Sequence, residues 1–153
     1  MPTDKLPPLE ECTCLAVRQA ARHITQFYDQ HLAPVGLRTT QFSILARLRR
    51  RGPMTINTLA DDMVMDRTTV GRNILPLERE GLLSIELGRR DRRSKELRLT
   101  DAGLERLRAG YEGWKQAQRE FAAAFGDERT VGLRALLHEV AATDLPIDAA
   151  AAG

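Results

Sequence analysis

The stretch that decides the fold runs from Thr55 to Thr100 and reads TINTLADDMVMDRTTVGRNILPLEREGLLSIELGRRDRRSKELRLT. Its first half predicts two helices separated by a turn at Val64-Met65. Thr55 and Asp66 are their expected N-caps, because Thr and Asp side chains accept free N–H groups in a first helical turn. Alternating apolar residues in 83–99 predict two strands around an arginine-rich loop. Helix, turn, helix and basic hairpin in this order predict a winged helix-turn-helix.

The second of these helices carries polar side chains of the kind that contact DNA bases. If Val70, Ile74 and Leu77 face the core, the outward side holds five such residues: Arg67, Thr68, Thr69, Arg72 and Asn73. Arginine can bond to guanine, asparagine to adenine, and a threonine methyl can touch the thymine methyl. No acidic residue occurs between Asp66 and Glu78 to repel phosphate. This face is therefore predicted to enter a major groove.

The loop of the hairpin is the second candidate for DNA contact, through Arg90, Asp91, Arg92 and Arg93. An arginine here can enter a narrow minor groove. An Asp two residues before an Arg can pair with its guanidinium and hold the loop in shape. The alternative is a basic loop without a fixed structure.

Helices are predicted on both sides of this stretch. The first starts at Glu10 and ends at Pro34 and Gly36, and Thr39 or Thr40 is the expected cap of the next. That second helix ends in an arginine cluster, Arg47 and Arg49 to Arg51. The cluster has two interpretations, compensation of the helix dipole or contact with phosphate. Pro76, inside the expected DNA-reading helix, predicts a kink or a local break.

The region after Thr100 predicts two more helices, with Thr100 capping the first and Asp127 the second. Its apolar stripe, like that of the first helix, is longer than a small core needs, which favours a dimer interface. The predicted fold is mainly α with a small β-hairpin wing. A winged helix-turn-helix at about 39–100 is joined to dimerisation helices at about 10–33 and 101–143. Together they form a single unit, 10–143, between flexible tails at 1–9 and 144–153.

Composition narrows the class of protein. The chain has 153 residues and a formal net charge of +2, so local charge clusters are more informative than the total. No apolar run is long enough to span a bilayer, and the N-terminus lacks the apolar core of a signal peptide, so we expect no membrane partner and a cytoplasmic location. Phosphate loops, dinucleotide fingerprints and nucleophile elbows are absent from the sequence. We therefore expect no enzyme, no cofactor and no metal site.

Several motifs resemble the MarR family of bacterial transcription regulators. They are GLRTTQF at 36–42, LADDM at 59–63, RTTV at 67–70 continuing to LEREGLL at 77–83, DRR at 91–93, and LRLTDAG at 97–103. The resemblance implies a homodimer that binds a palindromic operator, usually as a repressor, and is released by a small molecule or an oxidant. It also implies that Arg93 enters the minor groove and that Asp91 braces it.

The effector is less defined. Many family members have an arginine in the first wing strand that helps to hold an anionic ligand, and here Ile85 stands in its place. A pocket would need other residues, for which the candidates are Arg18, Arg22, His23, Phe27 and Phe42.

Cys14 suggests another trigger, because peroxide-sensing members of the family carry a cysteine near the start of the first helix. A thiol-based oxidant sensor is therefore one alternative, and a small packed residue is the other interpretation of Cys14. Cys12 and Cys14 alone are too few ligands for a metal. An alternative of another class is a winged-helix module that binds protein and not DNA.

Overall fold

The structure is a computed structural model, and it describes residues 8–148. Of the predicted tails, 1–9 and 144–153, the parts at 1–7 and 149–153 lie outside the described residues. The chain divides into two compact units, Met1–Ala117 and Gln118–Gly153, and each is treated separately below. No helix among residues 8–148 combines the length and the apolarity that crossing a membrane requires.

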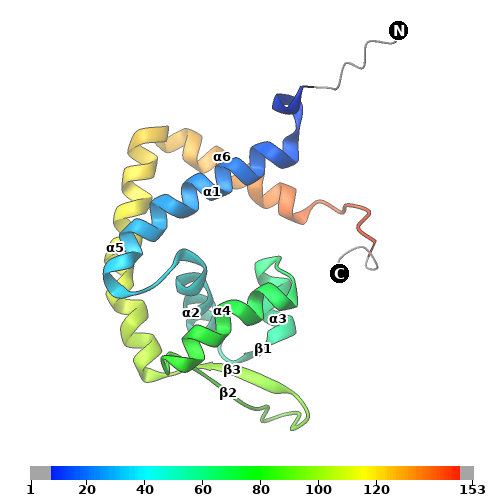
Figure 1. Cartoon of the computed structure of the whole chain (residues 1–153), viewed down its shortest axis with the longest axis vertical. Helices are drawn as coiled ribbons and strands as arrows, with labels where there is room; N and C mark the ends of the chain where they lie inside the picture. Colours follow the sequence, from blue (N-terminus) through cyan, green and yellow to red (C-terminus); the bar gives the residue numbers. More distant parts are fainter. Residues whose placement is uncertain (1–7, 149–153) are drawn as a thin grey trace. The chain divides into compact units, whose positions relative to one another are not determined.

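The described residues form mainly helices and a small antiparallel sheet, as predicted. The first unit contains α1 (Thr13–Leu32), α2 (Thr39–Arg51), β1 (Met54–Thr55), α3 (Ile56–Met63), α4 (Arg67–Arg79), β2 (Leu83–Leu87), β3 (Lys95–Leu99) and most of α5 (Asp101–Phe125). Figure 1 shows α2, α3 and α4 gathered beside the hairpin of β2 and β3. The second unit contains the end of α5 and the helix α6 (Asp127–Ala142).

Three predicted N-caps are confirmed. The Thr55 hydroxyl accepts the Thr58 N–H at 3.1 Å, and an Asp66 carboxylate oxygen accepts the Thr69 N–H at 2.8 Å. The Thr100 hydroxyl accepts the Gly103 N–H at 3.0 Å and donates to the Gly81 carbonyl. Each cap satisfies an N–H that has no partner within its helix, so the starts of α3, α4 and α5 are fixed locally.

Three other predicted helix starts are wrong. α1 begins at Thr13, because Cys12 is its N-cap and a short 3-10 helix, Leu9–Glu11, precedes it. Neither Thr39 nor Thr40 caps α2. Thr39 is already helical, and its N–H and hydroxyl both donate to Asp29 at 2.7 Å. Asp127 is likewise the first residue of α6, whose N-cap is Gly126.

The core of the first unit joins the helix-turn-helix to its neighbours. Leucine and isoleucine side chains from most of its elements have an exposed fraction of 2% or less: Leu32, Ile44, Leu45, Leu59, Ile74, Leu77, Leu83 and Leu97. Burying each of these side chains contributes about 1.5–3 kcal/mol relative to leaving it in water. Hence α4 is held by its apolar side, as the sequence predicts, and its other side remains available. Pro76 does not end the helix, which continues to Arg79.

The sheet has three strands in the order β1-β3-β2, so the sequence missed one strand. β1 has only two residues and pairs Met54 with Leu97 of β3, a contact between segments far apart in the chain. Leu97 is fully buried, whereas Leu87 is 63% exposed. The apolar alternation of Leu83, Ile85 and Leu87 predicts one buried face for β2, and at Leu87 this prediction is wrong.

Cross-strand contacts near the loop end of the hairpin compensate an unfavourable pairing. Glu86 of β2 lies directly opposite Glu96 of β3. Like charges in this position destabilise a sheet. The Arg98 guanidinium lies 2.8 Å from a carboxylate oxygen of each glutamate, so it offsets their repulsion and ties the two strands together near the loop.

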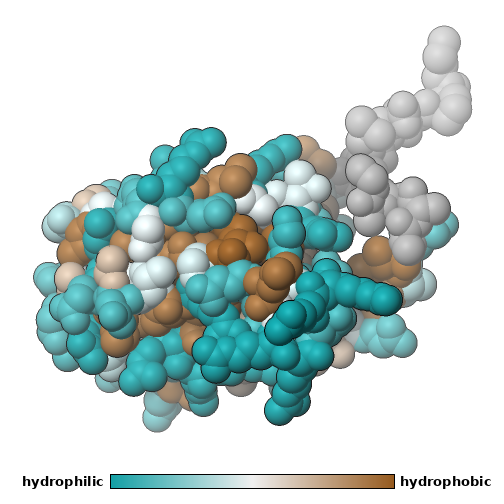
Figure 2. All heavy atoms as spheres, turned by 90° about the horizontal axis from the view of Figure 1, so that it is seen from below, coloured by the Kyte–Doolittle hydropathy of each residue, from teal (hydrophilic) through white to brown (hydrophobic). Residues whose placement is uncertain are grey.

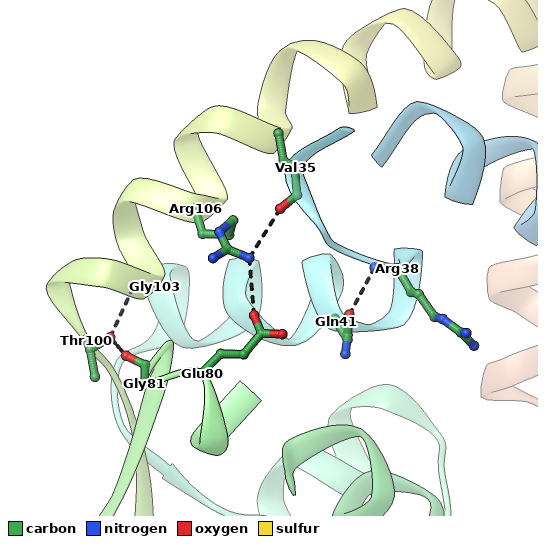
Figure 3. Close-up of polar contacts among 8 residues, drawn as sticks. All are labelled: Val35, Arg38, Gln41, Glu80, Gly81, Thr100, Gly103 and Arg106. Carbon is green, nitrogen blue, oxygen red and sulfur yellow. Dashed lines mark hydrogen bonds and ion pairs between the residues drawn. The ribbon is translucent and has the colours of Figure 1, made fainter. Parts of the chain in front are cut away.

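Helix α5 packs against the backbone of the helix-turn-helix region (Figure 3). A Cβ added at Gly103 would overlap the Leu82 carbonyl, and one at Gly110 would lie 3.2 Å from the Phe42 ring. Arg106 adds polar contacts, since its Nη1 donates to the Val35 carbonyl and to the Glu80 carboxylate, each at 3.2 Å. Glu80 is the C-cap of α4, so Arg106 fixes the end of α4 to α5.

Candidate nucleic-acid interface

The N-terminal turns of α4 present a polar surface. Arg67, Thr68 and Arg72 are exposed, whereas Val70 and Ile74 on the opposite side are buried. Asp66 sits at the positive end of the helix dipole. Hydrogen bonds from the Thr69 hydroxyl and then the Thr69 N–H lower the pKa of Asp66 below the ordinary value of an aspartic acid. The start of the helix is therefore capped by an ionised carboxylate.

Thr69 and Asn73, also predicted to face outward, are only half-buried and make bonds within the helix. The Thr69 hydroxyl donates to Asp66. The Asn73 side-chain amide donates to the Thr69 carbonyl at 2.9 Å. These bonds orient both side chains, and they leave the oxygen and the second N–H of the Asn73 amide for another partner.

The loop between β2 and β3 has a defined shape. The Gly88 N–H donates to the Ser94 carbonyl at 2.9 Å, and the Ser94 hydroxyl donates to the Asp91 carbonyl at 2.8 Å. A Cβ at Gly88 would lie 2.6 Å from both the Asp91 carbonyl oxygen and the Ser94 hydroxyl, so only glycine fits without a shift. The predicted alternative of a loop without fixed structure therefore does not describe this segment.

Asp91 supports the loop in a different way from the one predicted. Its carboxylate accepts the backbone N–H of Arg93 at 2.9 Å. No ion pair joins the Asp91 carboxylate to the Arg93 guanidinium in the part of the chain that the structure describes. The guanidinium of Arg93 is exposed, as are those of Arg90 and Arg92. Asp91 thus fixes the backbone and leaves the arginine side chain free for other contacts.

Helix α4 and the hairpin meet at a hollow of about 390 Å³, which we call the basic hollow. It is lined by residues of β1, α3, α4 and the hairpin: Thr55, Ile56, Asn57, Arg67, Arg93, Ser94 and Lys95. Three cations from two separate elements therefore share one depression. Figure 2 views the side on which the hairpin lies in Figure 1, and long hydrophilic side chains project from it between exposed apolar residues.

Sequence reasoning missed the basic hollow. Arg67 and Arg93 were predicted separately, but Asn57 and Lys95 were not among the expected contacts. The cap motif at Thr55 is the one local signal at this place. Residues 55–57, 67 and 93–95 come together only through packing, which no spacing in the sequence reveals.

Two of the four arginines in the α2 cluster form ion pairs within the chain. Arg47 and Arg51 both pair with Asp62 of α3, whose side chain is 14% exposed. Their positive charges are therefore used to hold α3 against α2. Arg49 and Arg50 have no ion pair among residues 8–148.

The residues predicted to form an effector pocket are not brought together by contacts within the first unit. Arg18, Arg22 and His23 are exposed on α1. Phe27 packs edge-on against His31, with ring centroids 4.7 Å apart. Phe42 is buried and stacks on Trp114 at 6.0 Å. Ile85 packs partly buried against the core, so it supplies no charge for an anion.

Both cysteines are exposed and unpaired as disulfides. Cys12 Sγ accepts the Leu15 N–H at 3.4 Å, which makes it the cap of α1. Cys14 is therefore not packed in the core of the single chain.

Helix α6 exposes apolar residues. Leu133, Leu136, Leu137 and Val140 recur at steps of three and four and so share one side of the helix. The exposed fractions of the last three are 61%, 40% and 52%. Apolar side chains arranged in this way normally mark an interaction surface.

Fold and surface together define the class of protein, a winged helix-turn-helix regulator, and comparisons with known proteins agree. The model of the MarR family matches residues 37–95. The chain is 31% identical over 120 residues to the HTH-type transcriptional regulator PecS of Dickeya dadantii, covering 76% of this chain and 72% of PecS. This chain belongs to the MarR family of transcription regulators.

Solved structures of relatives include complexes with DNA. The Mycobacterium tuberculosis transcriptional regulator MosR in complex with DNA is 37% identical, with a TM-score of 0.74 over 86% of this chain and 96% of MosR. The transcriptional repressor CouR bound to a 23-mer DNA duplex is 25% identical, with a TM-score of 0.78 over 87% of this chain and 94% of CouR.

Proposed function

We propose that this chain acts in the cytoplasm as a homodimer that binds a palindromic operator in double-stranded DNA and represses transcription until a small molecule releases it. The observation that carries the proposal is the basic hollow, where cations of α4 and of the hairpin share one surface. A winged helix-turn-helix that places one helix in the major groove and its wing on the backbone or in the minor groove needs cations of both elements on one surface. The DNA complexes of MosR and CouR support it.

In this proposal Arg67, Thr68, Thr69, Arg72 and Asn73 face the major groove, and Arg90 to Arg93 lie along the backbone and the minor groove. Arg72 is the residue most suited to a base contact, because it is exposed and has no ion pair among the described residues. Arg67 and Lys95 line the basic hollow, where a phosphate would meet several cations.

The homodimer rests on α6. Its exposed leucines gain free energy if a second copy covers them. Two recognition helices about 34 Å apart would then meet successive major grooves on one side of the duplex.

The test is binding to DNA upstream of the chain's own gene, titrated in salt. We expect affinity to fall linearly on a double-logarithmic plot, because counterions are released when cations meet phosphates. Binding that is absent at every salt concentration, also with duplexes selected from a random pool, would contradict the proposal and favour a protein-interaction module.

The same assay separates two triggers. A panel of aromatic carboxylates and their CoA thioesters tests release by a small molecule. Peroxide tests the second candidate, an oxidant sensor, which is favoured by the exposure of Cys14. In that case a Cys14→Ser variant binds DNA but no longer responds to peroxide, and release of this variant by peroxide would exclude Cys14.

A further inference from the structure

Arg106 of α5 joins two segments that lie far apart in the chain (Figure 3). Its Nη1 donates to the Val35 carbonyl and to the Glu80 carboxylate, each at 3.2 Å. Val35 ends the short 3-10 helix Ala33–Val35 that connects α1 to α2, and Glu80 is the C-cap of α4. We propose that Arg106 is a positioning residue for DNA recognition, which holds the end of α4 so that its first turns meet the groove in a fixed direction. The inference rests on the proposed binding of α4 to DNA.

The Val35 carbonyl is a well-fixed acceptor, because the connection between α1 and α2 is held on both sides. The Asp29 carboxylate in the last turn of α1 accepts the N–H and the hydroxyl of Thr39, both at 2.7 Å. Gly36 adopts a left-handed conformation with φ of 71°, and a Cβ there would lie 3.3 Å from Arg106 Nη1. The guanidinium therefore lies close against the backbone of this turn.

Arg106 adds a second polar attachment between α5 and the end of α4. At the first, the Thr100 hydroxyl donates to the Gly81 carbonyl at 2.6 Å, and the Thr100 N–H donates to the Leu82 carbonyl at 3.3 Å. One attachment alone leaves a helix free to swing about it. The bond from Arg106 to Glu80 lies about 9 Å farther along α5, at 1.5 Å per residue, so it opposes that swing.

The length of α4 turns a small movement at its end into a larger one at its start. From Glu80 back to Thr68 the helix is about 18 Å long, so a tilt of about 5° moves its first turn by about 1.5 Å. Recognition of a base edge needs side chains placed within about 0.5 Å. Loss of the Arg106 contact therefore impairs sequence recognition more than binding to random DNA, which depends on phosphate contacts that carry no sequence information.

The contact is too exposed to serve mainly for stability. The side chains of Arg106 and Glu80 are 34% and 51% exposed. Ion pairs at such surfaces contribute little to the free energy of unfolding. Ile74 and Leu77 of α4 are buried in the core and hold the helix in the fold without this contact. Variants of Arg106 and Glu80 should therefore stay folded, so that their effect on DNA binding can be measured.

The experiment compares the affinity for an operator selected from a random pool with the affinity for a random duplex, using the full chain and its Glu80→Gln variant. This variant loses a negative charge, so a simple charge effect would strengthen binding to both duplexes. We expect the ratio of operator affinity to random affinity to fall about 5-fold instead. Glu78→Gln is the matched control, since Glu78 is exposed and has no ion pair among residues 8–148, and it should keep the ratio of the parent.

Two variants test Arg106 itself. Arg106→Met removes the donors but keeps an unbranched stem, and its ratio should fall at least as far as that of Glu80→Gln. Both bonds of Arg106 come from one nitrogen, and a lysine carries three donors on one nitrogen. Arg106→Lys should therefore recover most of the ratio. The double variant Arg106→Met/Glu80→Gln should be no worse than Arg106→Met, because the same contact is lost only once.

Ratios that stay at the parent value in Glu80→Gln and Arg106→Met would overturn the inference, and so would a double variant in which the two losses add. Amide hydrogen exchange without DNA gives a second readout. The N–H groups of Gly81 and Leu82, bonded to carbonyls of α4, should exchange faster in Arg106→Met than in the parent, whereas those of α3 should not change. Unchanged exchange at both positions would contradict the inference alone, whereas a parent chain that binds no duplex would contradict the proposed function.

Discussion

Helices α4 and α6 each leave one side exposed, and the two sides are opposite in chemistry. The first turns of α4 expose Arg67, Thr68 and Arg72, whereas α6 exposes Leu136 and Val140. An exposed arginine face gains from a partner with negative charge, and an exposed leucine face gains from another apolar surface. The comparison teaches that the two proposed contacts, α4 with DNA and α6 with a second copy, use different helices, so each should be separable by mutation.

The largest expected effect comes from Gly103→Ala, which tests whether α5 holds α4 firmly. The added Cβ overlaps the Leu82 carbonyl, and backbone cannot move aside as a side chain can. We expect a loss of about 3 kcal/mol in the free energy of unfolding, measured by denaturant titration at fixed protein concentration. Gly71→Ala is the control, because its Cβ meets nothing within 4 Å. A Gly103→Ala variant as stable as that control would contradict the packing described for α5.

Leu136→Lys should abolish the proposed dimer contact of α6. A charge in the apolar stripe of α6 prevents its burial against a second copy, so light scattering should show a monomer. Loss of the second half-site should weaken binding to a palindromic duplex on the order of 100-fold. His138→Lys, which adds the same group on the other side of α6, should remain a dimer. If the two variants behave alike, the stripe is not the interface.

Arg72→Ala should weaken base recognition by α4 and leave the dimer intact. If Arg72 contacts a guanine, its loss costs about 1–3 kcal/mol of discrimination. The measurement compares the affinities for the operator and for an operator with one base pair changed. Arg79→Ala, an exposed arginine at the other end of α4, should keep full discrimination. Unchanged discrimination in Arg72→Ala would exclude this residue from base recognition.

Arg93→Ala should have a smaller effect that is nearly independent of DNA sequence. A wing arginine in contact with the backbone or minor groove contributes about one unit to the slope of log affinity against log salt. We expect that slope to fall by about one unit on operator and random duplexes alike. Arg119→Ala, an exposed arginine outside the hairpin, should leave it unchanged.

The smallest effect concerns the cap of α4. The pKa of Asp66 is lowered in the folded chain, chiefly by hydrogen bonds from the Thr69 hydroxyl and N–H. The ionised carboxylate therefore stabilises the fold at pH values above its ordinary pKa of 3.8. This stabilisation is lost as the pH falls through the lowered pKa. Asp66→Asn should therefore be less stable than the parent near neutral pH, and the difference should shrink in acid. A difference that grows in acid would contradict the assignment.

The features that the sequence predicted correctly are those that depend on residues close together in the chain. Thr55, Asp66 and Thr100 bond to groups three positions away, so their motifs sufficed to place the starts of three helices. Thr39 could not be placed in this way, because its hydroxyl bonds to Asp29 in another helix. β1 was missed for the same reason, since two residues carry no periodicity and exist as a strand only through β3.

The candidate DNA interface follows the same rule. The sequence predicted which residues of α4 and of the hairpin could contact DNA. It did not predict that they line one basic hollow, because only the packed fold brings Arg67 and Arg93 together. The prediction that Asp91 pairs with the Arg93 guanidinium named the right residues. The group bound is the backbone N–H of Arg93, and residue types alone do not show which of the two groups lies nearer.

The most direct test of the central claim is selection of bound sequences from a pool of random duplexes, followed by the mass of the complex with the enriched duplex. We predict an inverted repeat whose half-sites are centred about 10 base pairs apart, bound by two copies of the chain. A pool without enrichment, or a single half-site bound by one copy, would contradict the account of α4 as the reader and α6 as the dimer contact.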